Sequence, residues 1–508
     1  MSVTTRSSRS RTLSTLVAST VFAVGVSMAA VPADAQTTAN NPITLSHVGV
    51  GATDSEMNFS WRTKYSGQEY VKYYPSGQPT ADRVIPANEA NYGALLYRSN
   101  HGTITGLRPG TEYTYQLGSD TGGWSEPATF RTQSRGDSWN FLAMADAQIG
   151  VNGQVAQQAE AWREAVKQAT GKAPNAQFIL HAGDQVEGWG SQVKQWEEFF
   201  SPEQVRSYPL ALAMGNHERY PSKLETRHFN EHVNFPNRVD GTANYYFERN
   251  NALFIVLDSN ESSDAAIEQH AEFVRQTAAT KGAGKDWIIA VMHHSPYTHS
   301  SHAKKDADVK RLREQLSPVF SEAGVDLVIG GHDHMYNRSR LMNGVEPVDA
   351  NKPAKSGDVL RPKKGEVLYL TSTTAGGGKY YHFHDVNGVE RKEFTSSTET
   401  DGTEYADPAI AVWQQDYTPD YSVVDVSKHK LTVRTYNVAD NSLVDDVTLD
   451  HSPLSNPGLG DGGGSSAEGS STGAIVGIVI GVLAALLGGL ALLAPQLRDL
   501  AARYGIRL

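Results

Sequence analysis

Short segments in which hydrophobic and polar residues alternate characterise the chain from about residue 42 to residue 132. Examples are Met57-Asn58-Phe59-Ser60-Trp61-Arg62 and Glu112-Tyr113-Thr114-Tyr115-Gln116-Leu117, with Gly, Pro and Asn turns between such segments. Alternation with a period of two gives a strand one apolar and one polar face. A series of short strands of this kind predicts an antiparallel, all-β sandwich, which we assign to residues 40–133.

From residue 139 onward, longer apolar strands alternate with helical stretches. Helical periodicity occurs in residues 155–170 and 265–277, and the predicted buried strands are residues 140–145, 177–182, 210–214, 252–257, 287–292 and 326–329. This alternation predicts an α/β domain, which we assign to residues 138–450. Ligands bind beyond the carboxyl ends of the strands in such domains, so functional residues are expected there.

The two ends of the chain have patterns typical of export and membrane anchoring. Three arginines precede an apolar run that ends at the small-residue sequence Ala33-Asp34-Ala35, so residues 1–35 are predicted to be a signal peptide. Residues 473–494 are uncharged and long enough for a transmembrane helix, after a flexible Gly/Ser-rich linker at 452–472. Arginines in the tail, residues 495–508, predict that it is cytoplasmic. The folded part is therefore expected to be extracytoplasmic and anchored by a C-terminal helix.

Composition narrows the classes of function. The formal net charge is -11 and acidic residues are spread along the chain, so no nucleic-acid partner is expected. The chain has no cysteine, which excludes disulfides, a thiolate metal site and a cysteine nucleophile. Any metal ion must be bound by nitrogen and oxygen ligands.

Residue types that bind metals follow five of the predicted strands. One such cluster alone has little weight, since an aspartate after a strand is usually a turn former or a helix cap. Five clusters at strand ends predict one shared site. They are Asp146-Ala147-Gln148, Gly183-Asp184-Gln185, Gly215-Asn216-His217-Glu218, His293-His294 and Gly331-His332-Asp333-His334.

These residue types suit a pair of metal ions. Two cations about 3.5–4 Å apart need a bridging carboxylate, for which Asp184 is suited, together with imidazole and amide ligands that leave part of the positive charge uncancelled. The remaining charge lowers the pKa of a bound water toward about 7 and so supplies hydroxide at neutral pH. The sequence therefore predicts attack of a metal-bound hydroxide on a phosphate ester.

In this order the motifs resemble those of the calcineurin-like metallophosphoesterases, specifically the purple acid phosphatases. Residues 103–111 resemble the strand-turn-strand signature of fibronectin type III modules, and the preceding sandwich resembles the fibronectin-like N-terminal domain of that family. The likeness covers the chain from about Pro42 to Asp450. It implies a multidomain protein whose second domain is an α/β/β/α sandwich.

The resemblance also implies a role for each site residue. Asp146, Asp184 and His334 would bind one metal ion, and the second would be bound by Asp184, Asn216, His293 and His332. His217 would protonate the leaving group, with Glu218 orienting it. His302 lies where the plant enzymes have a histidine that contacts the substrate phosphate, although a solvated loop histidine is an equal alternative.

This chain departs from the family at the tyrosine that ligates iron in the purple enzymes. We interpret Val186 as occupying that position, which leaves the metal pair open among iron, zinc and manganese. Gln148 stands where many relatives have a second ligand, and it is either a weak amide ligand or a neighbour of the ligands. The final motif has Asn337-Arg338 where Glu-Arg is common.

Two pairs of histidines, His293 with His294 and His382 with His384, are further candidates for the site. His293 is favoured over His294 as the ligand, because neighbouring strand residues point in opposite directions. His382 and His384 are interpreted mainly as surface residues or as neighbours of the ligands, with a role in a substrate loop as the alternative.

The predicted function is that of a hydrolase acting on a small phosphorylated substrate, a phosphate monoester. Phosphodiesters or nucleotides are the first alternative, since the same metal centre serves both classes and the pocket decides. A surface binding protein without activity is the second alternative. The complete ligand set argues against it.

Overall fold

The computed structural model describes residues 42–64, 67–90, 97–134, 136, 138–189, 192–219 and 227–453. The predicted signal peptide, the transmembrane helix, the tail and nearly all of the linker lie outside these residues. Among the described helices, none combines the length and the apolar character that a membrane crossing requires.

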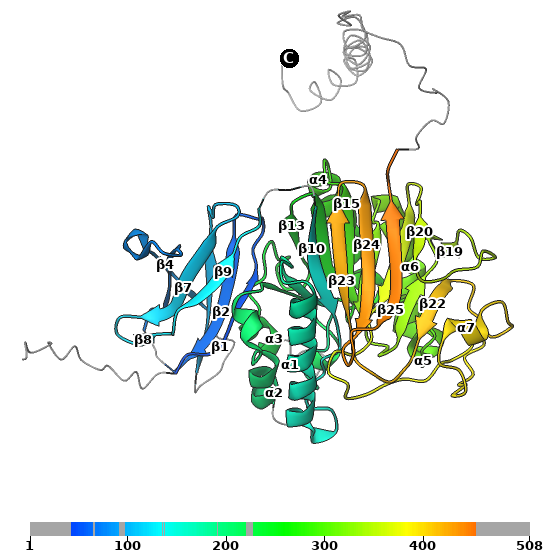
Figure 1. The fold of residues 1–508 in the computed structure, drawn as a ribbon, viewed down its shortest axis with the longest axis horizontal. Coiled ribbons are helices and arrows are strands. Elements are labelled where there is room, and N and C mark those ends of the chain that lie inside the picture. The colour runs from blue at the N-terminus through cyan, green and yellow to red at the C-terminus, as the bar shows by residue number, and fades with distance from the viewer. Residues whose placement is uncertain are drawn as a thin grey trace, which may run out of the picture. The chain divides into compact units, whose positions relative to one another are not determined.

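The described strands form three sheets (Figure 1). The first sheet has 11 strands in the order β20 (Asp358–Leu360), β25 (Leu443–Asp450), β24 (Lys430–Asn437), β23 (Asp420–Ser427), β10 (Ser138–Met144), β11 (Ile179–His181), β12 (Leu210–Leu212), β1 (Thr44–Val50), β2 (Met57–Thr63), β6 (Arg98–Ile104) and β5 (Asn88–Glu89). The second has 9 strands: β13 (Tyr245–Arg249), β14 (Ala252–Leu257), β15 (Trp287–His294), β16 (Leu327–Gly331), β21 (Glu366–Thr371), β17 (Tyr336–Ser339) and β22 (Ile410–Gln414), with β18 (Met342–Asn343) and β19 (Glu346–Pro347) beside them. The third has 5 strands: β4 (Arg83–Pro86), β3 (Tyr70–Pro75), β7 (Glu112–Ser119), β8 (Gly123–Trp124) and β9 (Ala128–Arg131).

The first and second sheets pack face to face across an apolar core. Phe141 and Phe178 of the first sheet stack with ring centroids 4.9 Å apart, and Phe254 of the second sheet packs edge-on against Phe141. Helices cover both outer faces, because each presents apolar residues at intervals of three and four along one side. The helices are α1 (Val155–Lys172), α2 (Gln192–Phe199), α3 (Arg227–His232), α4 (Asp264–Lys281), α5 (Ser301–Lys305), α6 (Ala307–Ala323) and α7 (Ser397–Thr400).

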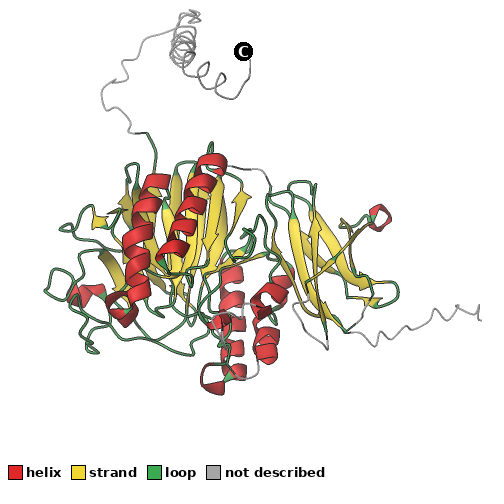
Figure 2. Ribbon diagram, turned by 180° about the vertical axis from the view of Figure 1, so that it is seen from behind, coloured by secondary structure: helices red, strands yellow, loops and turns green. Residues whose placement is uncertain are grey.

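Helices α1 and α2 lie on the first sheet and helices α4 and α6 on the second, as the views from the two sides show (Figure 2). The expected α/β/β/α sandwich is therefore confirmed. All six predicted buried strands and both predicted helices are present, as β10, β11, β12, β14, β15, β16, α1 and α4. The antiparallel strands β23, β24 and β25, which extend the first sheet from β10, were not predicted individually.

The N-terminal β-sandwich is also confirmed, but its sheet is continuous with that of the α/β domain. Phe59 and Trp61 of β2 pack with Tyr115 and Phe130 of the third sheet in a core of their own. Strand β1 pairs in parallel with β12, with Gly49 opposite Leu210. The two parts thus share one sheet, which the alternating pattern of each part does not reveal.

His47 lies at this junction and gives the fold a dependence on pH. Its ring is buried, stacks on Phe200 at 3.9 Å, and has Nδ1 3.0 Å from the carbonyl oxygen of Leu45. Burial lowers the pKa of His47 from 6.5 to about 4, so only the unfolded chain takes up this proton between these values. The contribution to stability is present above pH 6.5 and is lost as the pH falls toward 4.

We expect His47 to account for about 3 kcal/mol of the decrease in unfolding free energy over this range. His47→Phe keeps an aromatic ring on Phe200 and removes the titration, so its unfolding free energy should depend less on pH. Denaturant unfolding of both proteins at several pH values measures this. Parallel pH profiles would contradict the assignment.

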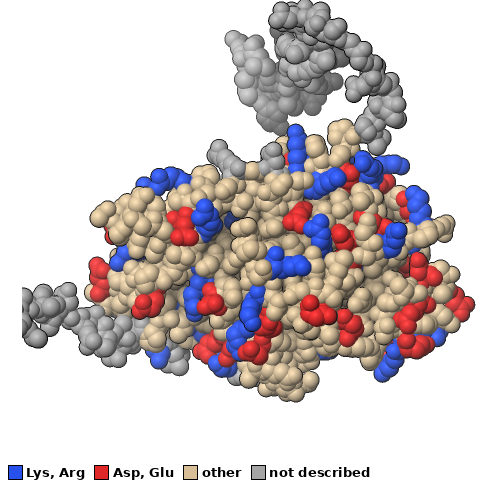
Figure 3. All heavy atoms as spheres, viewed as in Figure 1, with Lys and Arg blue, Asp and Glu red and all other residues tan. Residues whose placement is uncertain are grey.

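Basic and acidic side chains are interspersed on the molecular surface. On the face shown in Figure 3, Lys and Arg alternate with Asp and Glu over the α/β domain. The described residues on this face therefore form no continuous basic surface.

Candidate metal centre

All six predicted metal ligands lie at one edge of the α/β domain. Strands β10, β11 and β12 run parallel in the first sheet, as do β14, β15 and β16 in the second. The carboxyl ends of these strands meet at the same edge, and the predicted clusters follow them directly. Residues from five strand ends thereby form one site.

Glycines before the ligands make room for other ligands. A Cβ atom at Gly183 would lie 2.4 Å from His293 Nδ1, one at Gly215 would lie 2.0 Å from Asp184 Oδ1, and one at Gly331 would lie 2.3 Å from Asp146 Oδ2. Asp146 and Asp184 themselves have φ of 53° and 54°, a conformation that is strained for residues other than glycine. The glycines in the motifs are therefore required by the close approach of neighbouring ligands.

Asp184, Asn216 and His293 converge on one point. His293 Nδ1 donates to the carbonyl oxygen of Ala182 at 2.9 Å, which leaves the lone pair of a neutral ring on Nε2. Nε2 lies 3.1 Å from Asn216 Oδ1 and 3.2 Å from Asp184 Oδ2. The structure thus places His293 in the predicted position, whereas His294 contacts the Ser259 hydroxyl through Nδ1 at 2.8 Å.

Asp146 and His334 form the second part of the centre. His334 Nδ1 donates to the carbonyl oxygen of Lys379 at 2.7 Å, so Nε2 faces Asp146 Oδ1 at 3.3 Å. The backbone N–H of His332 donates to Asp146 Oδ2 at 2.9 Å. One ring nitrogen of His332 lies within 4.8 Å of ligand atoms of Asp184 and His293, which joins the two parts.

This donor set fits metal cations. In both His293 and His334 a backbone carbonyl orients the ring, a common arrangement for histidines that bind metals. The other nitrogen of each ring faces carboxylate or amide oxygens, so atoms that accept hydrogen bonds face one another. A cation between them satisfies all of these atoms at once. The Oε1 atom of buried Gln148 has no hydrogen-bond partner among the described residues and is an additional oxygen donor nearby.

The charges of Asp184 and His293 interact strongly. Burial would lower the pKa of His293, but the Asp184 carboxylate outweighs it and raises this pKa to about 10. Conversely, burial would raise the pKa of Asp184, and the positive charges of His293 and His217 lower it well below its usual range. Asp184 is therefore a carboxylate in the folded protein, as a bridging ligand requires.

His217 lies beside this group and is held by Glu187 and Gln148. Its Nδ1 donates to the backbone carbonyl of Glu187 at 2.8 Å and lies 3.3 Å from that residue's carboxylate. Its Nε2 lies 2.8 Å from the side-chain amide of Gln148 and 3.9 Å from Asp184 Oδ2. Nε2 thus faces Asp184, and Gln148 contacts both His217 and Glu187.

The interpretation of Val186 needs correction. Val186 is buried in the core beneath α1 and α2, whereas the next residue, Glu187, is three residues after Asp184 and reaches the centre. The tyrosine of the purple enzymes is expected three residues after the bridging aspartate, so Glu187 occupies that position and Val186 does not. The conclusion that no tyrosine follows Asp184 in this loop is unchanged.

Glu218 has a different role from the expected one. Its buried carboxylate accepts hydrogen bonds from the backbone N–H groups of Gly215, Asp184, Gln185 and Val186 at 2.7–3.2 Å. It therefore holds together the two loops that carry Asp184 and Asn216, and the contacts to the His217 ring come from Glu187 and Gln148. The local motif could not distinguish these two roles, because both place a glutamate beside the histidine.

His302 is part of the site and is not a solvated loop histidine. It lies on the short helix α5, and its ring centroid is 4.2 Å from that of His332. Its Nδ1 lies 2.6 Å from Asp333 Oδ1, a buried carboxylate that also accepts from the hydroxyls of Thr298 and Ser300. Sequence reasoning had given Asp333 no role, although it lies between two predicted ligands.

Tyr381 and Lys379 are site residues that sequence reasoning missed. The ring of Tyr381 contacts the rings of His302 and His334, with centroids 4.7 and 5.2 Å apart, and Lys379 Nζ lies 4.5 Å from its centroid. Burial raises the pKa of Tyr381, and the carboxylates of Asp333, Asp146 and Asp184 raise it further. The adjacent His382 instead contacts the hydroxyl of Tyr417, and His384 Nδ1 contacts the carbonyl oxygen of His382. His382 is partly exposed, as a surface residue would be, whereas His384 is buried, so the surface interpretation is wrong for His384.

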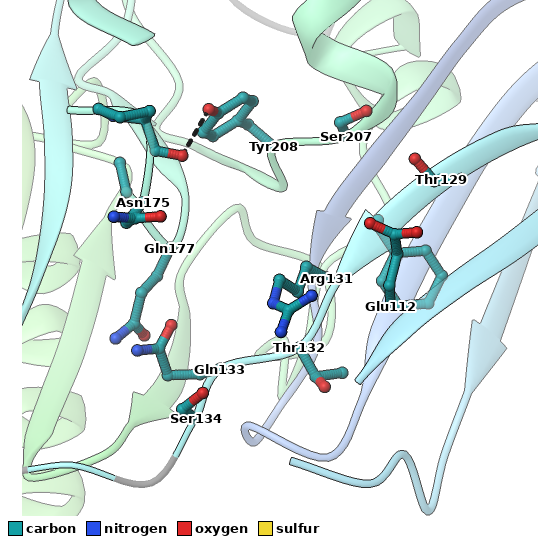
Figure 4. Close-up of a pocket in the computed structure, with 13 residues that line it drawn as sticks. Glu112, Thr129, Arg131, Thr132, Gln133, Ser134, Asn175, Gln177, Ser207 and Tyr208 are labelled. Carbon is teal, nitrogen blue, oxygen red and sulfur yellow. Dashed lines mark hydrogen bonds between the residues drawn. The ribbon is translucent and has the colours of Figure 1, made fainter. Parts of the chain in front are cut away.

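A cavity of about 380 Å³ at the junction of the β-sandwich and the α/β domain is separate from this centre (Figure 4). Arg131 and Glu112 line it from the sandwich, and Asn175, Gln177 and Tyr208 line it from the other side. None of the predicted catalytic or metal-binding residues lines it.

Comparisons with known proteins agree with this arrangement. Residues 140–336 match the family model for calcineurin-like phosphoesterases, and residues 44–132 match that for the purple acid phosphatase N-terminal domain. The chain is 25% identical over 307 residues to purple acid phosphatase 18 of Arabidopsis thaliana, covering 58% of this chain and 65% of that protein. It is 23% identical over 306 residues to the probable purple acid phosphatase 20 of the same plant, covering 58% and 68%. The chain thus spans about two thirds of the length of these relatives.

A solved structure shows the same fold. Purple acid phosphatase PPD1 from yellow lupin (Lupinus luteus) seeds superposes with a TM-score of 0.63 at 15% sequence identity, covering 81% of this chain and 74% of that one. The two matched family models cover the N-terminal sandwich and the first part of the α/β domain. The chain therefore contains a calcineurin-like phosphoesterase domain at residues 140–336, preceded by a purple acid phosphatase N-terminal domain at residues 44–132.

Proposed function

We propose that this protein is an extracytoplasmic phosphoesterase that hydrolyses phosphate monoesters with two metal ions. The observation that carries the proposal is the orientation of His293 and His334. Each ring donates Nδ1–H to a backbone carbonyl and directs Nε2 at the oxygens of Asp184, Asn216 or Asp146. Such a convergence of lone pairs is suited to cations.

The ligands divide into two sets that share one carboxylate. Asp146, Asp184 and His334 would hold one cation, and Asp184, Asn216, His293 and His332 would hold the other. When bound, the pair of cations supplies an activated water molecule and neutralises the charge of the phosphate. Iron, zinc and manganese all accept such nitrogen and oxygen ligands.

Two histidines outside the ligand sets act on the substrate in this proposal. His217 directs Nε2 toward the centre and donates a proton to the leaving oxygen, with the Glu187 carboxylate 3.3 Å from Nδ1 stabilising the charged ring. His302, held by Asp333 at 2.6 Å, contacts the phosphate group.

The patterns at the two ends of the chain support the proposed location. A basic, apolar and small-residue series precedes residue 36, and an uncharged apolar run occupies residues 473–494. An exported and anchored protein would encounter its substrates outside the cytoplasmic membrane.

Intact cells that express the full chain should release phosphate from an added monoester that does not cross membranes. A chelator that does not cross membranes should abolish this release, because the ligands alone do not activate water. Manganese, zinc or iron added in excess of the chelator should restore it. Metal content of the purified protein, measured by plasma mass spectrometry, identifies the pair.

The possible outcomes separate the parts of the proposal. Turnover that persists in excess chelator, with no metal detected, would contradict a metal-dependent reaction. Activity that appears only after cell lysis would contradict the location alone. A higher kcat/KM for the bis-para-nitrophenyl ester than for para-nitrophenyl phosphate would contradict the monoester preference and favour a phosphodiesterase.

A further inference from the structure

The loop of residues 376–381, here called the glycine loop, reaches the metal centre from the end of β21. Its sequence is Gly376-Gly377-Gly378-Lys379-Tyr380-Tyr381. A Cβ atom at Gly376 would lie 1.9 Å from the carbonyl oxygen of Ala147, and one at Gly378 would lie 2.8 Å from Gln158 Nε2. Glycine is therefore needed for the loop to approach the turn that carries Asp146 and Gln148.

Hydrogen bonds attach the glycine loop to the metal-binding residues at both ends. Just before it, the hydroxyl of Thr374 donates to the carbonyl oxygen of Asp146 at 2.6 Å. The carbonyl oxygen of Lys379 accepts from His334 Nδ1 at 2.7 Å. Gln415 Nε2 donates to the carbonyl oxygens of both His334 and Tyr381, at 2.9 and 2.7 Å. The position of Tyr381 is thus set by the same contacts that orient a predicted metal ligand.

Tyr381 stands between the metal-binding and the substrate-binding histidines. Its ring packs nearly perpendicular to the rings of His302 and His334, at interplanar angles of 80° and 70°. No hydrogen bond among the described residues uses its hydroxyl, and the residue is only half-buried. The hydroxyl is therefore available to a ligand of the centre.

Lys379 adds a positive charge on the same side. Its side chain is exposed, lies over the ring of Tyr381, and forms no ion pair with the described residues. A phosphate monoester dianion carries one more negative charge than a diester, so a cation here favours the monoester.

We propose that the Tyr381 hydroxyl donates a hydrogen bond to a phosphate oxygen of the bound substrate and that Lys379 beside it selects phosphate monoesters over diesters. The glycine loop would thus bind the phosphate group, although it supplies none of the predicted metal ligands. We call this arrangement the phosphate clamp. This inference rests on the proposed function, because it requires phosphate to bind at the metal centre.

Binding of inorganic phosphate to the metal-loaded protein, measured by calorimetry, tests the clamp separately from turnover. Tyr381→Phe should raise the Kd about tenfold or more, the usual effect of losing a hydrogen bond to a charged group. Tyr380→Phe is the matched control, since the Tyr380 hydroxyl lies 3.3 Å from the Cβ position of Gly377 and its ring packs on Tyr417, away from the centre. This control should leave the Kd unchanged within about twofold.

A second pair of variants tests the charge. Lys379→Met should raise the Kd for phosphate by about two- to fivefold, as expected for an exposed charge. It should also lower kcat/KM for para-nitrophenyl phosphate more than for the bis ester. Lys392→Met removes an exposed lysine that pairs with Glu390, and it should change neither quantity.

Three results would overturn the inference. Equal Kd values for Tyr381→Phe and Tyr380→Phe would show that the Tyr381 hydroxyl does not contact phosphate. The proposed function would still stand in that case, provided that the wild-type protein binds phosphate. A visible absorption band of the iron-loaded protein that disappears in Tyr381→Phe would show that Tyr381 binds the metal instead. If the folded, metal-loaded wild type bound no phosphate, the proposed function would fail together with the clamp.

Discussion

Asp184→Ala is expected to abolish turnover and to remove both metal ions. Its carboxylate lies 3.2 Å from His293 Nε2 and 3.9 Å from His217 Nε2, and it is the only ligand assigned to both cations. Without it, no carboxylate joins the two sets of ligands, and each cation loses one of its ligands. We expect kcat/KM to fall by at least about 10⁴-fold, more than the loss of a general acid alone produces.

Metal analysis and steady-state kinetics on the same preparation measure this effect. Asp184→Asn keeps the shape and an oxygen that can accept from the backbone N–H of His217, so it separates loss of charge from loss of packing. Asp349→Ala removes an exposed carboxylate that pairs with Lys352, and it should leave metal content and rate unchanged. Retention of two cations per chain in Asp184→Ala would show that Asp184 is not the bridge.

His217→Ala should keep both cations and lower turnover by about 10²–10⁴-fold, the range for a lost general acid. The leaving group sharpens this test. Para-nitrophenolate departs with little need of a proton, whereas an alkyl alkoxide needs one, so the loss should be larger for an alkyl phosphate. The contacts of His217 with Glu187 and Gln148 direct its ring toward the centre. His217 is not one of the six predicted metal ligands, so its loss should not release the cations.

His382→Ala is a matched control for this variant. His382 is also close to the glycine loop in sequence, but its ring contacts the Tyr417 hydroxyl, and its loss should have little effect on the rate. Equal losses on aryl and alkyl phosphates in His217→Ala, with metal content intact, would argue that His217 binds phosphate oxygens and delivers no proton.

The contacts of Glu218 and Val186 depend on residues that are distant in the chain. Glu218 is adjacent to His217, and Val186 is adjacent to Glu187. The carboxylate of Glu218 accepts from N–H groups more than thirty positions earlier in the chain, as between Glu218 and Asp184, and Val186 faces a core formed by α1 and α2. Whether a side chain beside a ligand points into the site or away from it depends on the turn and on what packs behind it, and neither is encoded in the motif.

The sequence by itself predicted the two folded parts and the meeting of six candidate ligands at one edge of the sheets. The physical reason is that both depend on short stretches of sequence. Hydrophobic periodicity sets the strands, and parallel strands place the residues at their carboxyl ends along one edge. The glycines beside the predicted ligands are also visible in the sequence. Each is needed because a side chain at its position would collide with a neighbouring ligand.

Only the tertiary structure decided which residues surround the ligands. Tyr381 contacts His302 and His334, Glu187 and Gln148 contact His217, and β1 pairs with β12 although more than a hundred residues of chain lie between them. These contacts arise from loops whose paths are set by packing against distant elements, as the hydrogen bonds of Gln415 to His334 and Tyr381 illustrate. No periodicity or spacing along the chain records such contacts, because the free energy that favours them is gained only when the two sheets close on each other.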